Sequence, residues 1–300
     1  MKYLTPRRAY CERLGQWPLL FTAMALLGVA LSDATAQEPA LDYVFQLGNG
    51  RADYTESIAL DSSDNVYSTG FFTGPIDVDP GPGVVELQHE GENAIYVQKL
   101  DAAGNLVWAR ALGNIGGGFD TLIQESPRVT ADNSGNVYVA GPFHGTVDFD
   151  PGVGTSMLTS TDEDDMYVLK LDASGDFVWV TMFQSPAELV CLDVAADSTG
   201  NLYLGGAFQG TVDFDPGPGT SELTALGFRD IFLLKLDTNG DLAWAFAPGD
   251  ENGYGRAYGL ALDASDNIYL AGNFGGPLDF DPSEGTAVLE DSGSYVAKFN

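Results

Sequence analysis

The sequence predicts an all-β protein built from four copies of one unit. A short motif, Asn-Val-Tyr or a close variant, recurs four times, and a second motif, Asp-x-Asp-Pro, recurs with it. In both motifs successive copies lie 71, 65 and 66 residues apart. Two independent markers with one rhythm indicate tandem structural repeats. The motif tyrosines are Tyr67, Tyr138, Tyr203 and Tyr269.

Each unit is expected to contain four main strands. In the second unit these are residues 128–131, 137–143, 167–171 and 177–183. The first two are joined by Asp-Asn-Ser-Gly-Asn and the last two by Asp-Ala-Ser-Gly-Asp. Asp bonds the amides of a turn, and Gly or Asn takes the positive φ that a tight hairpin needs. Neighbouring strands are therefore expected to be antiparallel.

A β-propeller fits these strands better than a two-layer sandwich. The central strands are apolar on both faces, as in Ile231-Phe232-Leu233-Leu234. A sandwich strand has one polar face, whereas a strand in the middle of a propeller blade is covered on both sides. Four strands in each repeat is also the blade pattern. The predicted fold is a propeller of four repeats of about 65–71 residues.

The repeat also predicts the domain boundaries. Residues 41–48 resemble the last strand of a unit, whereas 295–300 form a third strand with no fourth after it. We therefore expect residues 41–47 to pair with residues 295–299, so that an N-terminal strand closes the C-terminal blade and leaves no exposed edge. A fragment of a longer array is the alternative. The four repeats are placed at about 49–113, 114–184, 185–247 and 248–300.

The repeated motifs resemble a known family. Asn-Val-Tyr, Gly-x-Phe-x-Gly, Val-Asp-Phe-Asp-Pro-Gly and Lys-Leu-Asp-x-x-Gly-Asn-Leu-x-Trp look like the SBBP-type β-propeller repeats of secreted bacterial proteins. The similarity covers roughly residues 41 to 300. It implies a propeller, but it brings no substrate and no catalytic residues.

The first 36 residues predict export. A basic start is followed by the apolar run 18–31 and by the small-x-small site Ala34-Thr35-Ala36, which is typical of a cleaved signal peptide. The remaining chain, 37–300, has 9 Lys and Arg against 41 Asp and Glu, a net charge near −32. Such a chain repels nucleic acid, and no integral membrane segment is expected after cleavage. The predicted location is secreted or periplasmic.

Paired aspartates are the best candidates for a binding site. Two carboxylates at i and i+2 of an extended strand point the same way, and they repel each other unless a cation bridges them. Hard oxygen ligands beside a Pro-Gly turn suit Ca²⁺. The alternative is that the second aspartate only caps the turn while the first is solvated. The candidate calcium ligands are Asp77, Asp79, Asp148, Asp150, Asp213, Asp215, Asp279 and Asp281.

One lysine in each unit competes for these charges. Lys99, Lys170, Lys235 and Lys298 occupy one position of the repeat, and in so acidic a chain each is expected to pair with a carboxylate. The lysine would satisfy part of an aspartate pair or make a structural contact between blades, and we favour the second interpretation.

Residues that break the repeat do not form a catalytic set. His89 and His144 lie at different repeat positions, Arg128, Arg229 and Arg256 occur singly, and 162–165 is an acidic run. Two unrelated histidines make neither a metal triad nor a Ser-His-Asp set. Cys191, in an apolar run, is expected to be a buried inert thiol.

The predicted function is therefore an exported, non-catalytic scaffold or binding module, with or without stabilisation by Ca²⁺, and with a protein or glycan as its ligand. The alternative is a secreted hydrolase or lyase that uses carboxylates near the axial pocket.

Overall fold

The computed structural model describes residues 40–48, 53–89, 93–113, 126–161, 165–249, 253–283 and 285–300. The signal segment 1–36 and residues 162–164 of the acidic run lie outside these ranges. The described residues form strands and turns, with no helix among them, which confirms the all-β prediction. In the described part of the chain there is accordingly no helix of the length and apolar character that crossing a membrane requires.

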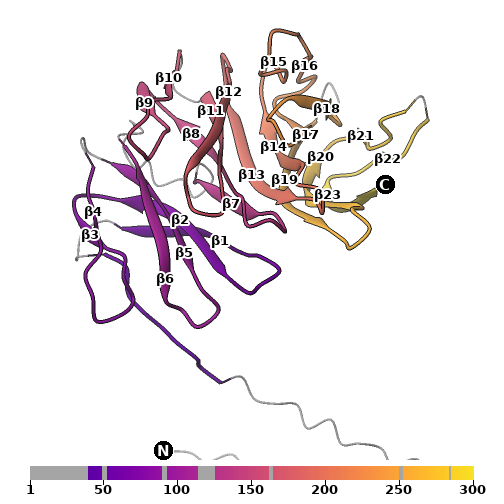
Figure 1. The fold of residues 1–300 in the computed structure, drawn as a ribbon. Coiled ribbons are helices and arrows are strands. Elements are labelled where there is room, and N and C mark those ends of the chain that lie inside the picture. The colour runs from indigo at the N-terminus through magenta and orange to yellow at the C-terminus, as the bar shows by residue number, and fades with distance from the viewer. Residues whose placement is uncertain are drawn as a thin grey trace, which may run out of the picture. The chain divides into compact units, whose positions relative to one another are not determined.

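Four antiparallel sheets follow one another along the chain (Figure 1). Each begins with two strands joined by a tight turn and continues, after a small hairpin, with a third strand beside the second. The first sheet contains β1 (Tyr54–Leu60), β2 (Val66–Phe72), β5 (Ala94–Leu100) and β6 (Leu106–Leu112); the second contains β7 (Arg128–Ala131), β8 (Val137–Phe143), β11 (Asp165–Leu171) and β12 (Phe177–Phe183). The third contains β13 (Leu189–Ala196), β14 (Leu202–Phe208), β17 (Asp230–Leu236) and β18 (Leu242–Phe246); the fourth contains β19 (Tyr254–Leu262), β20 (Ile268–Gly275) and β23 (Gly293–Phe299).

The strand predictions for the second unit are confirmed, except that β11 begins two residues before the expected 167. Repeated sheets of this kind form a β-propeller-like repeat fold. Each unit also has a two-stranded hairpin that the sequence analysis did not predict, and it stands apart from the main sheet in Figure 1. The hairpins are β3 (Ile76–Asp77) with β4 (Glu86–Leu87), β9 (Thr146–Asp148) with β10 (Met157–Thr159), β15 (Thr211–Asp213) with β16 (Glu222–Thr224), and β21 (Leu278–Asp279) with β22 (Val288–Leu289).

Hydrophobic clusters lie between consecutive sheets. The first and second sheets share a cluster that includes Tyr67, Val97 and Val139, and the second and third share one that includes Val168 and Phe232. A further cluster joins the third and fourth sheets. The central strands are buried on both faces, as in β11, all of whose residues are buried. This burial explains why their sequences are apolar without alternation.

Tyrosine and tryptophan side chains of one sheet also donate hydrogen bonds to turn carbonyls of the next sheet. Tyr138 donates its hydroxyl to the carbonyl of Gly200 at 2.8 Å. Trp108 Nε1 donates to the carbonyl of Ala173 at 3.0 Å, and Trp179 Nε1 donates to Thr238 at 3.1 Å. These bonds repeat the same contact across successive sheets, so the tyrosines and tryptophans fix the spacing of the units as well as filling the core.

The expected pairing of residues 41–47 with 295–299 is not present in this structure. The fourth sheet has three strands with β23 at its edge, and residues 41–47 form no strand. Instead, Leu47 packs on the outer face of the first sheet, and the ring of Tyr43 lies against Gly104. Val44 and Val296, on the two segments expected to pair, are each 79% exposed. In this structure the N-terminal segment thus contacts the first sheet, and closure of the ring is not shown.

Candidate functional site

The paired aspartates cap the loops of the small hairpins. Oδ1 of Asp148 accepts hydrogen bonds from the amides of Asp150 at 3.1 Å and Ser156 at 2.8 Å. Oδ1 of Asp150 accepts from the Gly152 amide at 2.8 Å. The same bonds are made by Asp77 and Asp79, by Asp213 and Asp215, and by Asp279 and Asp281. The first aspartate is therefore a cap too, and not a merely solvated side chain.

The loop folds tightly around the second carboxylate of each pair. Oδ2 of Asp150 lies where the Cβ of a side chain at Gly154 would go, so a larger residue there would have to displace the capping carboxylate. Among the described residues, no three His, Cys, Asp or Glu side chains are grouped as a metal site needs. These contacts account for the conserved spacing within the four loops without an ion, and calcium binding stays a prediction.

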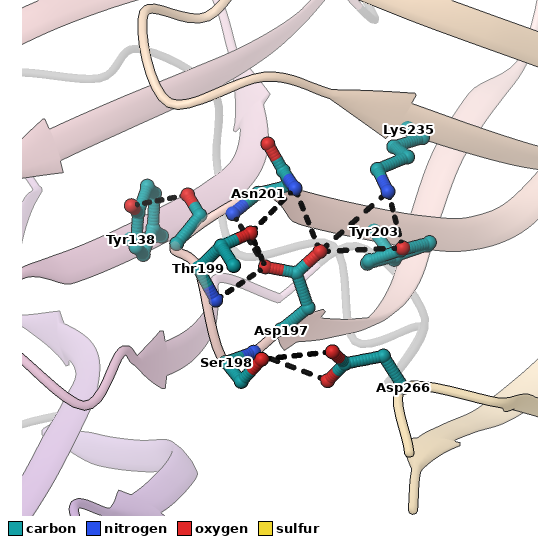
Figure 2. Close-up of polar contacts among 9 residues, drawn as sticks. Tyr138, Asp197, Ser198, Thr199, Asn201, Tyr203, Lys235 and Asp266 are labelled. Atoms are coloured by element: carbon teal, nitrogen blue, oxygen red, sulfur yellow. Dashed lines mark hydrogen bonds and ion pairs between the residues drawn. The ribbon is translucent and has the colours of Figure 1, made fainter.

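A different aspartate, outside the Asp-x-Asp pairs, lies in the turn between the first two strands of each unit. It is the centre of a larger hydrogen-bond network, shown for Asp197 in Figure 2. Oδ1 of Asp197 accepts from the amides of Thr199 and Asn201, each at 2.9 Å. Oδ2 accepts from Asn201 Nδ2 at 2.7 Å and from the Tyr203 hydroxyl at 3.4 Å. Burial would raise the pKa of Asp197, but the hydrogen bonds from Asn201 and Thr199 outweigh it and lower the pKa to about 2. The carboxylate is therefore held ionised by its own turn.

The repeated lysines join this network and not the Asp-x-Asp pairs. Lys235 Nζ lies 3.5 Å from Asp197 Oδ2 and donates to the Tyr203 hydroxyl at 2.6 Å. In the second unit, Lys170 instead donates to the carbonyl of Thr238 in the next sheet at 3.0 Å. All four lysines lie over the motif tyrosine of their own unit, with Nζ 4.7–5.0 Å from the ring centroid. Three lysines therefore pair with the turn aspartate of their own unit, and among the described bonds only that of Lys170 makes the contact between units that the sequence predicted.

An open groove of about 560 Å³ lies beside the first aspartate pair. Its walls are the loop residues Asp79, Pro82 and Val85 on one side and Val107 with Trp108 of β6 on the other. The volume is in the range of small-ligand sites. Of its other polar lining residues, Asn105 bonds Asp101 and Arg110 bonds the turn of the next sheet, so the open groove has no converging set of free polar groups.

Most of the residues that break the repeat remain apart. His89 accepts a hydrogen bond from the Gly74 amide at 3.1 Å, whereas His144 is exposed in another unit. Cys191 is buried, and burial raises the pKa of its thiol to about 12, so it is inert as expected. Burial also raises the pKa of Asp193, although the Leu260 amide donates to it at 2.8 Å. The bond to Leu260 connects the third sheet to the fourth.

Two of the three single arginines do come together. Arg229 Nε and Arg256 Nη2 each donate to the carboxylate of Glu188 at 2.9 Å, one to each oxygen. Gln209 Nε2 donates to the same carboxylate at 3.2 Å. Glu188 precedes β13, Arg229 precedes β17, and Arg256 belongs to β19, so this cluster lies where the third and fourth sheets meet. We call these four residues the junction cluster.

Both arginines were candidates from the sequence, whereas Glu188 and Gln209 were not predicted. The signal that could have indicated Glu188 is its position in the repeat. With the motif tyrosines aligned, Glu188 stands where the other units have Ala52, Ile123 and Tyr254. Aligning the four units residue by residue, and not only by motif, would have shown that the third unit alone carries this glutamate.

Comparisons with known proteins agree with a repeat fold. No family model matches the chain. The chain is 25% identical over 230 residues, 68% of its length, to an uncharacterised WD repeat-containing protein of Acanthamoeba polyphaga mimivirus. It is 31% identical over 152 residues, 51% of its length, to the regulatory protein FlaEY of Caulobacter vibrioides. These matches cover 16% and 15% of the two relatives, so the chain spans less than a fifth of either.

Proposed function

We infer that the protein is an exported, non-catalytic β-propeller scaffold or binding module of the SBBP-repeat type. The observation that carries this inference is the use of the repeated charged side chains. The aspartates of all four units accept hydrogen bonds from backbone amides, and the lysines contact tyrosine rings or turns. Groups committed to the same structural bonds in each copy support the fold and leave recognition to residues that differ between copies. The similarity to a WD repeat-containing protein supports a scaffold role.

Export and lack of turnover are tested together in the full-length chain expressed in a bacterial host. We expect a periplasmic or secreted product that begins at Gln37. Neither this product nor its Asp193→Asn variant should hydrolyse a panel of chromogenic glycosides and esters. Asp193 is the appropriate probe, because a carboxyl whose pKa is raised by burial is what the alternative hydrolase would use. Turnover that Asp193→Asn abolishes would establish the enzyme instead.

The same secreted product tests closure of the ring. Residues 41–47 have the sequence of a last strand, and the edge of β23 has no partner strand among the described residues. We propose that the two pair, with Tyr43 opposite Lys298 as Trp244 is opposite Lys235. Amide hydrogen exchange should then show residues 42–47 protected to the same degree as β18. Free exchange across the segment would mean that the sheet ends at β23.

Calcium stabilisation is the other part of the proposal, and it rests on the eight paired aspartates. Within the described residues their hydrogen bonds from backbone amides end on Oδ1, so a second oxygen of each stays available. Since the chain carries a large negative charge that opposes compaction, a cation bound only by the folded state stabilises it by mass action.

We expect Tm to rise in millimolar Ca²⁺ by more than in NaCl of equal ionic strength. Asp148→Asn with Asp150→Asn removes one of the four pairs and should reduce the rise in Tm by about a quarter. Asp64→Asn with Asp241→Asn, which removes two charges from exposed turn positions outside the small hairpins, is the matched control and should not reduce the rise. If sodium reproduces the whole effect, the aspartates are turn caps only.

A further inference from the structure

The junction cluster is the place where the third unit departs most in chemistry from the others. Phe228 and Arg229 stand where the first unit has Glu92-Asn93, the second has Glu163-Asp164 and the fourth has Asp291-Ser292. An aromatic and a cationic residue have thus replaced an acidic residue and a small polar or acidic one, in a protein with 43 acidic and 13 basic side chains. The core does not require this change, since Phe228 is 71% exposed.

A second partly exposed aromatic residue, Tyr254, belongs to the segment whose backbone neighbours Phe228. Arg229 and Tyr254 form a parallel bridge, and the Phe228 amide donates to the carbonyl of Gly253 at 3.2 Å. Tyr254 is 48% exposed. Its ring lies over Gly275, where any side chain would collide with it. Arg229 Cζ lies 5.4 Å from the centroid of the Phe228 ring, and Tyr254 shares a face of β19 with Arg256, so each partly exposed ring lies next to an arginine of the junction cluster.

The same junction contains a donor and an acceptor without partners. Arg256 Nη1 and Asn273 Oδ1 are buried, and neither has a hydrogen-bond partner among the described residues. The two residues are opposite each other in the β19–β20 ladder, so their side chains are on one face of the sheet. Unpaired buried polar atoms are uncommon, and each calls for a missing partner. A hydroxyl satisfies both atoms at once, because it accepts from the guanidinium and donates to the amide oxygen.

We propose that this junction is a saccharide-binding site. The inference deepens the proposed function, since it names the ligand class of the binding module. The aromatic rings of Phe228 and Tyr254 cover the apolar face of a sugar, while Glu188, Gln209 and Arg256 with Asn273 bond its hydroxyls. A neutral saccharide fits better than an anionic one, because the protein as a whole is strongly negative and would repel a polyanion.

The test is affinity electrophoresis of the mature protein in native gels that contain galactomannan, xyloglucan or dextran, with polygalacturonate as the anionic probe. We expect retardation in at least one neutral gel and none with polygalacturonate. Phe228→Ala and Asn273→Ala should each weaken the retardation about tenfold, the effect of losing one good contact. Phe228→Tyr keeps the ring and should keep the retardation. Val153→Ala, which truncates a fully exposed side chain in another unit, is the matched control.

Each outcome is decisive once thermal melting shows that the variants are folded. No retardation in any neutral gel, or retardation that Phe228→Ala leaves intact, overturns the saccharide site while leaving the scaffold role to its own test. Retardation by polygalacturonate alone would overturn the neutral class. Recovery of shortened oligosaccharide after incubation would instead support the site and refute the non-catalytic function, so the two failures are distinguishable.

Discussion

Replacement of Gly206 by alanine is expected to cost at least about 3 kcal/mol of folding free energy, at the upper end of overpacking effects. Gly206 in β14 is opposite Cys191, where β13 has an irregular register. The irregularity turns the Val190 carbonyl oxygen toward the Gly206 Cα, and an added methyl group would lie well inside contact distance of that oxygen. It would also lie 2.7 Å from the Phe232 ring. A backbone oxygen held in a sheet cannot move aside as a flexible side chain does.

The neighbouring glycine provides the control for this prediction. A methyl group on Gly205 would meet only the Leu270 side chain, at 3.1 Å, and that side chain can shift by a few tenths of an ångström. Urea unfolding followed by tryptophan fluorescence should therefore show a much larger loss for Gly206→Ala than for Gly205→Ala. Equal losses would mean that the carbonyl contact does not restrict this position.

This close approach recurs, and it explains a motif that the sequence analysis used only as a marker. Gly70 and Gly272 face the carbonyls of Tyr54 and Arg256 in the same way, each opposite an irregular first strand. The glycine of Gly-x-Phe is thus required by a bulge, which locally brings two backbones together. Gly141 is the exception, because β7 pairs with β8 without an irregularity and Gly141 meets Pro127 at 3.1 Å.

The sequence predicted those parts of the fold that depend on local pattern. Strand positions, hairpin turns and the two-sided burial of central strands follow from periodicity and turn chemistry within one unit. The small hairpins were missed because β3 and β21 have only two residues each, and side-chain caps from the aspartate pair stabilise their loops. Short apolar runs of that length carry no periodic signal.

Contacts between units were harder to predict. The lysine position was recognised, but its partners in the turn aspartate and the tyrosine ring depend on cross-strand register, which pairs Lys235 with Tyr203. The junction cluster depends on four segments from two sheets, and no spacing of the repeated motifs reveals it. What could have indicated it is the departure of Phe228 and Arg229 from the acidic residues of the other units.

Trp108→Ala is the second substitution expected to have a large effect, about 3–5 kcal/mol, as for other large core truncations. Only 7% of Trp108 is exposed. Its indole donates to the Ala173 carbonyl at 3.0 Å, and its ring lies against Gly175, a glycine with φ of 78° in the turn of the next sheet. The substitution removes apolar burial and leaves a turn carbonyl without its donor, so both terms destabilise the contact between the first and second sheets.

Trp244 provides the matched comparison for Trp108 because it occupies the same position of the third unit. It is 37% exposed, and no hydrogen bond from its indole is found among the described residues. Trp244→Ala should therefore cost only about 1–2 kcal/mol, in proportion to the smaller area that it buries. Chemical denaturation of both variants measures the difference directly. If Trp108→Ala cost no more than Trp244→Ala, the indole would not be what holds consecutive units together, and the packing of Tyr67, Val97 and Val139 would have to account for that contact alone.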